Sequence, residues 1–162
     1  MPVTRFHDAV TALIAGCQAA PALAGIPVYD GPAVSTGTDP DFIIVGHDGV
    51  YTTDGTLAAD TTAGTYTQVN LEMTGVTEET GFIGCVLACQ SGDTGDLAGR
   101  RARATALLGA IEDALDVNSG YLAGAAGVMF DGVSDGRWAY RQTAAGVAVI
   151  VPFRVTYSTQ WQ

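Results

Sequence analysis

The side chains that most often carry acid–base or nucleophilic chemistry are scarce in this chain. His7 and His47 are the only histidines, and neither lies near a serine or cysteine motif typical of a hydrolase. Glu78 and Glu79 are adjacent carboxylates that could share a proton as an acid/base pair. They fall in a stretch, 78–81, that we predict to be a turn, where a solvated pair is expected. The sequence therefore predicts no catalytic residue.

The three cysteines, Cys17, Cys85 and Cys89, do not form a pattern typical of a disulfide framework or a metal site. Their odd number argues against a set of paired disulfides. Cys85 and Cys89 are predicted to share one face of a strand, about 13 Å apart along it. That distance is too long for one disulfide or one metal ion. We expect buried free thiols and no metal site.

Glycine-rich motifs do not indicate a cofactor either. A dinucleotide-binding G-x-G-x-x-G is absent, and a phosphate-binding loop of the G-K-[ST] type is impossible because the chain has no lysine. Four Asp-Gly pairs resemble parts of calcium loops but lack the oxygen spacing and the distal glutamate. Turns explain them better, and they occur at 48–49, 54–55, 131–132 and 135–136.

Arginines gather at the start of a predicted helix spanning 94–117, while Glu112, Asp113 and Asp116 lie near its end. This order opposes the helix macrodipole, which favours acidic groups first. The order fits a partner surface, although chance explains it as well, and the arginines fit either a solvated face or an interface. The candidate interface residues are Asp48, Tyr51, Asp54, Asp60, Arg100, Arg101, Arg103 and Arg154.

Length and composition predict one globular domain over residues 1–162. The chain is 48% hydrophobic and only 15% charged, which excludes a disordered protein. Acidic residues number 17 against 7 basic ones, so the net charge is −10. This charge argues against nonspecific DNA binding, but it does not exclude a surface that DNA passes without adhering. No apolar run is long enough to span a membrane, and the start does not resemble a signal peptide, so we expect synthesis in the cytoplasm.

Alternation of apolar residues over 147–157 predicts a strand with one dry face, preceded by a turn at 143–146. Trp138 and Tyr140 continue the alternation upstream, which predicts a hairpin. Pro152 suggests that its strand is an edge strand or is bulged, because proline cannot donate to a ladder. The other strands are predicted at 26–30, 41–46, 66–74, 81–90 and 128–133, with helices at 4–19 and 94–117.

This order predicts an α+β fold with a single largely antiparallel sheet and two main helices packed on one face. Residues 47–65, after the second strand, are rich in glycine, aspartate and threonine, and we predict a long loop there. A loop of that length is either functional or mobile.

Several phrases in order along the chain resemble the tail terminator proteins of long-tailed bacteriophages, also called minor tail or tail completion proteins. They cover most of the chain: P-V-Y-D-G-P at 27–32, D-F-I-I-V-G at 41–46, the strand over 79–92 ending in S-G-D, the helix phrase at 101–112, and V-P-F-R-V-T-Y at 151–157.

The resemblance implies a structural virion protein of the tail or neck that is not an enzyme and needs no cofactor. Such proteins form rings, usually hexamers, that cap the head-proximal end of the tail tube and stop its polymerisation. The implied partners are further copies of the chain, the tail tube protein and the head completion or stopper protein, with DNA passing through the lumen and no membrane contact. The alternatives are another neck component, such as a stopper or connector, and a small ligand-binding α+β domain.

Overall fold

The computed structural model of the chain describes residues 3–32, 40–52, 57–118 and 127–162. Its elements in order are α1 (Phe6–Ala19), η1 (Pro21–Leu23), β1 (Val28–Asp30), β2 (Asp41–Val45), β3 (Gly64–Leu71), β4 (Val76–Ser91), α2 (Leu97–Asn118), β5 (Val128–Ser134), β6 (Ala139–Thr143) and β7 (Gly146–Trp161). Apart from the short η1, this is the predicted order. The α+β fold is confirmed: two helices accompany a sheet of 7 strands, in which only the described pair β1 and β2 is parallel.

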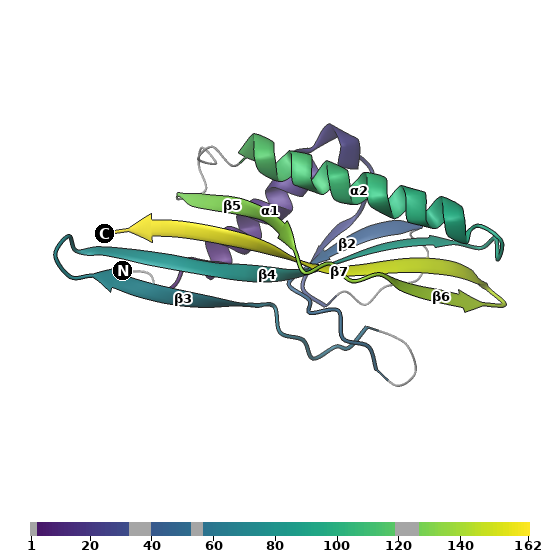
Figure 1. Ribbon diagram of the computed structural model, residues 1–162, viewed down its shortest axis with the longest axis horizontal. Coiled ribbons are helices and arrows are strands. Elements are labelled where there is room, and N and C mark those ends of the chain that lie inside the picture. Colours follow the sequence, from purple (N-terminus) through teal and green to yellow (C-terminus); the bar gives the residue numbers. More distant parts are fainter. Residues whose placement is uncertain (1–2, 33–39, 53–56, 119–126) are drawn as a thin grey trace.

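A long ribbon of β4 and β7 runs through the sheet and organises the other strands (Figure 1). The two strands have 16 residues each and pair from Thr77 opposite Trp161 to Ser91 opposite Val147. β2 and β3 pair with β4, whereas β5 and β6 pair with β7. β3 and β6 therefore lie on opposite edges of the sheet, and they also flank opposite ends of the ribbon.

Both helices cover the same face of the sheet, as predicted (Figure 1). The strand alternation supplies the buried surface there, because every second residue of β7 points toward α1 and α2. These residues are Val147, Val149, Val151, Phe153, Val155 and Tyr157. The predicted dry face of this strand is confirmed. In the described part of the chain, neither helix combines the length and the apolar character that crossing a bilayer requires.

The opposite face carries a smaller apolar cluster, centred on Phe42, Ile44, Val86 and Ala88, against which Leu57 packs. The residues predicted as a long loop are therefore partly tied to the sheet. Gly64 and Thr65 already belong to β3, and Tyr51 forms an isolated antiparallel bridge with Leu57. Residues 53–56 of the predicted loop lie outside the described residues.

The predicted C-terminal hairpin is present as β6 and β7, but one expectation about it is wrong. β7 is not an edge strand, because it lies between β4 on one side and β5 and β6 on the other. Pro152 falls in the gap between the residues of β7 that pair with β6 and those that pair with β5, so no ladder bond needs its missing N–H. Trp138 and Tyr140 are 44% and 52% exposed, because they lie outside the apolar core beneath the helices.

The predicted turn at 78–81 is also wrong. The chain turns at 72–75 instead, where the N–H groups of Thr74 and Gly75 donate to the carbonyl of Leu71 (2.9 and 3.1 Å). Gly75 adopts a φ of +66°, which is in the left-handed region that glycine accepts without strain. As a result β4 begins at Val76, and Glu78 and Glu79 lie within it rather than in a solvated turn.

Candidate assembly surface

The most unusual buried group is the carboxylate of Glu79, which is 0% exposed. Its Oε1 accepts hydrogen bonds from the main-chain N–H of Arg5 (3.1 Å) and from the hydroxyl of Tyr157 (2.9 Å). Its Oε2 accepts one from the side-chain amide of Gln68 (2.7 Å). Burial raises the pKa of the Tyr157 hydroxyl, and the Glu79 carboxylate raises it further, so this hydroxyl stays a donor.

Glu79 therefore joins the start of α1 to β3, β4 and β7. Arg5 precedes the first helical residue, so the carboxylate lies at the positive end of the helix macrodipole. The described residues around it offer no nucleophile beside a base, and we assign the cluster a structural role. The prediction of a solvated pair is wrong for Glu79.

The predicted interface arginines on α2 contact other residues of the same chain. The Nε of Arg103 donates to Oδ2 of Asp41 (2.9 Å), and Arg100 pairs with Asp96 (2.9 Å) and lies 3.8 Å from Asp41. Asp41 begins β2 and is almost buried. The Asp41 carboxylate therefore stabilises two of the three arginines that lie near the N-terminal end of α2, where the helix dipole disfavours positive charge. Arg101 is exposed and lies over the ring of Tyr140, 5.8 Å from its centre.

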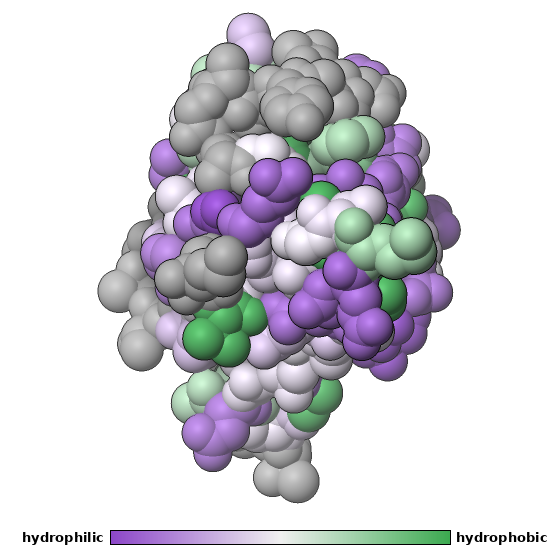
Figure 2. Space-filling model, turned by 90° about the vertical axis from the view of Figure 1, so that its left-hand side faces the viewer, coloured by the Kyte–Doolittle hydropathy of each residue, from purple (hydrophilic) through white to green (hydrophobic). Residues whose placement is uncertain are grey.

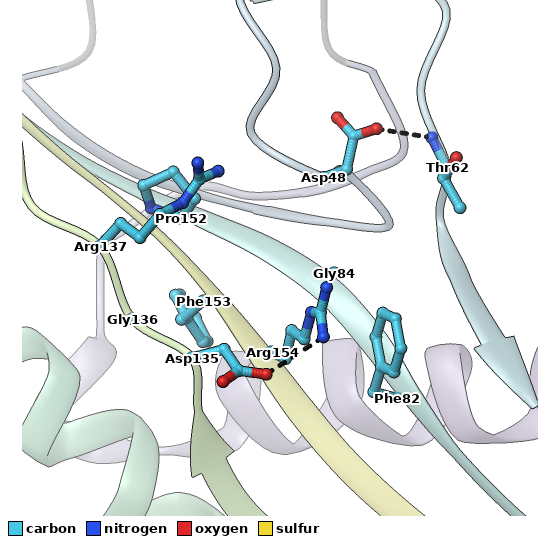
Figure 3. Close-up of a pocket in the computed structure, with 10 residues that line it drawn as sticks. All are labelled: Asp48, Thr62, Phe82, Gly84, Asp135, Gly136, Arg137, Pro152, Phe153 and Arg154. Atoms are coloured by element: carbon cyan, nitrogen blue, oxygen red, sulfur yellow. Dashed lines mark hydrogen bonds and ion pairs between the residues drawn. The ribbon is translucent and has the colours of Figure 1, made fainter.

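Arg154 lies elsewhere, in a groove of about 680 Å³ on the face opposite the helices (Figure 3). Its guanidinium stacks on Phe82, 4.1 Å from the ring centre, and pairs with Asp135 (3.1 Å). The side chain of Arg137 lines the same groove and forms no ion pair with another described residue. None of the groove residues is a serine, cysteine or histidine.

Among the predicted interface residues of the β2–β3 connection, Asp48 lines the same groove as Arg154. Asp48 accepts hydrogen bonds from the N–H groups of Val50 (3.0 Å) and Thr62 (3.1 Å). Burial opposes its charge, but these bonds hold the pKa of the carboxyl below its usual value. Asp48 therefore shapes the connection. Asp60 is exposed, and Asp54 lies outside the described residues.

Tyr51 and His47, from the same connection, are turned inward. Burial raises the pKa of Tyr51 to about 12, although the charge of Arg141 acts in the opposite direction. His47 is 1% exposed; its Nδ1 accepts the N–H of Gly49 (2.9 Å) and its Nε2 lies 2.9 Å from the carbonyl of Ala58. A neutral ring with its proton on Nε2 satisfies both contacts. The histidine holds the connection together.

The three cysteines are free and buried, as predicted. Burial raises the pKa of Cys17 to about 11, and burial together with the charge of Asp41 raises that of Cys89 to about 12. Burial likewise raises the pKa of Cys85. Protonated, enclosed thiols are poor nucleophiles and behave as small apolar groups.

The surface best suited to bind another protein is the free edge of β3, a strand of 8 residues. It is exposed on both faces and contains no charged residue and no proline. Natural proteins usually protect such edges with lysine, proline, a bulge or a covering element. Among the described residues, only those of β4 pair with β3, and the register between the two strands shows no bulge.

The ladder between β3 and β4 determines which main-chain groups of β3 are free. The N–H of Gly84 donates to the carbonyl of Ala63 (2.8 Å), so these opposed residues form a hydrogen-bonded pair. Hydrogen-bonded pairs alternate with non-bonded ones in an antiparallel ladder. With the observed register, the main-chain groups of Tyr66, Gln68 and Asn70 therefore point away from β4.

β6 offers a second free edge at the opposite side of the sheet. All 5 of its residues are exposed. The N–H of Arg137 donates to the carbonyl of Pro152 (3.0 Å), and the same alternation directs the main-chain groups of Tyr140 and Gln142 away from β7.

The other two outer strands are less suited to pair with a partner. β1 has only 3 residues and is followed by Gly31 and Pro32. β5 has an irregular register between Phe130 and Gly132, and the exposed Asp131 lies at this bulge. Short length, a bulge and a charge are devices that prevent edge-to-edge pairing.

Exposed apolar side chains near β3 do not form one continuous patch. Figure 2 views the molecule from the end that carries the β3–β4 turn and shows hydrophobic groups separated by hydrophilic ones. The large exposed hydrophobic residues of this hairpin are Tyr66, Val69, Leu71 and Met73, of which Met73 is 101% exposed. A partner would therefore bind this end through main-chain hydrogen bonds supplemented by single apolar contacts. No protein-family model matches the chain, and no curated protein matches it.

Proposed function

We propose that the chain is a structural protein of the virion of a long-tailed bacteriophage, and that it caps the head-proximal end of the tail tube as a ring. In this role it stops polymerisation of the tube and presents a surface for joining to the head. The observation that carries the proposal is the pair of uncovered strands, β3 and β6, on opposite edges of one sheet. A ring requires two different contact surfaces on every subunit.

The charge of the chain supports the same role. A net charge of −10 without any lysine suits a ring through which DNA passes, because phosphates find few cations to hold them. Most of the arginines are also engaged within the chain, as Arg100 and Arg103 are with Asp41. The same repulsion between copies opposes ring formation in free solution and favours it where a tube end holds the copies together.

Infection with a phage in which the gene for this chain is inactivated tests the proposal. We expect tail tubes of uncontrolled length and heads that remain unjoined, with both defects reversed by supplying the chain from a plasmid. Tails of normal length beside unjoined heads would instead indicate another neck component, such as a stopper. Normal, joined particles would contradict any role in the virion neck.

A further inference from the structure

We infer that the free edge of β3 in one copy pairs, as an antiparallel strand, with the free edge of β6 in the next copy. The partner is thus a second copy of the chain, bound head to tail. The inference deepens the proposed function by naming the contact between neighbours. It takes from that function only the premise that the chain assembles with itself.

Strand directions favour this pair of edges. β3 is antiparallel to β4, β4 to β7, and β7 to β6, so β3 and β6 run in opposite directions within one molecule. β3 and β6 lie on opposite edges of the sheet. A second copy in the same orientation, shifted sideways and along the β4–β7 ribbon, therefore places its β6 beside β3 of the first copy. The joined strands are then antiparallel, and the helices of both copies lie on the same face (Figure 1).

The free main-chain groups of the two edges also face the same side, and both outward-facing residues of β6 find a counterpart in β3. Residues Tyr66, Gln68 and Asn70 of β3 and Tyr140 and Gln142 of β6 direct their N–H and C=O groups outward. Each opposed pair of such residues exchanges two hydrogen bonds, so the two residues of β6 give roughly four bonds. Their side chains lie on the helix-covered face in both strands, since Gln68 bonds to Glu79 and Tyr140 lies under Arg101.

Charge does not oppose the contact, although two copies of a chain with net charge −10 repel each other elsewhere. β3 has no charged residue, and the only charge in β6 is that of Arg141. The edges are therefore places where two acidic molecules can approach without placing like charges opposite each other. Tyrosines in both strands add aromatic side chains of the kind that interfaces favour.

When β3 of each copy pairs with β6 of the next, an open row of copies has a free β3 at one end and a free β6 at the other. Further copies add there until the rotation between neighbours closes the ring. Pairing of β3 with another β3 would instead stop at a dimer. The two arrangements predict different products from the same variants.

Proline at an outward-facing position blocks an edge but spares the ladder inside the molecule. Asn70→Pro blocks β3 and Tyr140→Pro blocks β6, while Asn70→Ala and Tyr140→Ala keep the N–H and serve as matched controls. Circular dichroism and thermal melting establish that each variant is folded. Should Asn70→Pro unfold the chain, Asn70→Lys provides an edge lysine as the second blocking variant.

Sedimentation is measured at high protein concentration and at an ionic strength that screens the net charge. We expect the wild type and both alanine variants to form species larger than dimers, and each blocked variant alone to remain at the monomer mass of 16.6 kDa. An equimolar mixture of the two blocked variants should form a dimer and nothing larger, because one open β3 meets one open β6.

Dimers of Tyr140→Pro alone would overturn the inference in favour of β3 pairing with β3. A monomeric wild type, or assembly that both proline variants leave unchanged, would overturn it as well. These results are separate from the infection experiment. Tail defects together with unaffected assembly would reject the strand contact alone, whereas assembly as expected in a chain that the virion does not need would reject the proposed function alone.

Discussion

Replacing Glu79 by leucine is expected to lower the free energy of unfolding by roughly 3–5 kcal/mol, because three donors lose their acceptor and each unsatisfied buried donor costs about 1–3 kcal/mol. These donors are the main-chain N–H of Arg5, the amide of Gln68 and the hydroxyl of Tyr157. Chemical denaturation followed by circular dichroism measures the loss. Tyr157→Phe removes one donor and keeps the carboxylate, so it should cost only about 1 kcal/mol.

The neighbouring residue provides the matched control for this prediction. Glu78 lies on the opposite face of β4, is only half-buried, and forms no ion pair with another described residue. Glu78→Gln should change stability by less than about 0.5 kcal/mol. Equal stability of Glu79→Leu and the wild type would show that the buried carboxylate does not join α1 to the sheet.

Truncation of Phe153 to alanine is expected to cost about 3–5 kcal/mol, the usual range for emptying a buried phenylalanine site. Phe153 is on the helix-covered face of β7 and belongs to the main core with α1 and α2. Because it lies near the middle of the long ribbon, a cavity there weakens the packing of both helices on the sheet. Thermal and denaturant unfolding should both record the loss.

Phe82 offers a comparison with the same change of side chain. It is half-buried on the other face, where Arg154 stacks on its ring. Phe82→Ala should cost about 1 kcal/mol, mainly from the lost contact with the guanidinium. A larger loss for Phe82 than for Phe153 would contradict the assignment of the main core to the helix-covered face.

The fold class could be predicted because the strongest signals in the sequence are local. The alternation along β7 fixes which of its residues are buried, since successive side chains of a strand point to opposite faces. The same alternation could have predicted that Glu79 is buried. Alternation traced back from Ile83 through Gly81 places Glu79 on the buried face, but the turn assigned to 78–81 interrupted it.

The remaining errors concern contacts between distant parts of the chain. Pro152 lies where β7 pairs with neither β5 nor β6, so its missing N–H breaks no ladder bond although β7 is a central strand. No local sequence pattern reveals this gap between β5 and β6. Arg103 and Asp41 are 62 residues apart, so their ion pair is invisible in the sequence. The sequence also does not reveal that the apolar core stops short of β6, which leaves Tyr140 exposed.

The candidate assembly surface depends on the same kind of distant information. The sequence suggested an interface at the arginines of α2 and at the β2–β3 connection, and most of those side chains have partners inside the molecule. The free edges of β3 and β6 emerge only once the strand order is known. The sequence of an uncharged, polar segment such as β3 predicts a strand. It does not predict whether the outer edge of that strand is paired.

Electron microscopy of the purified chain mixed with phage tail tubes tests the proposed tail-capping role most directly. We expect a ring at one end of each tube, the end that joins the head, and no further growth when tube protein is added. Tubes that remain bare at both ends and continue to lengthen would contradict the proposal that this chain caps a tail.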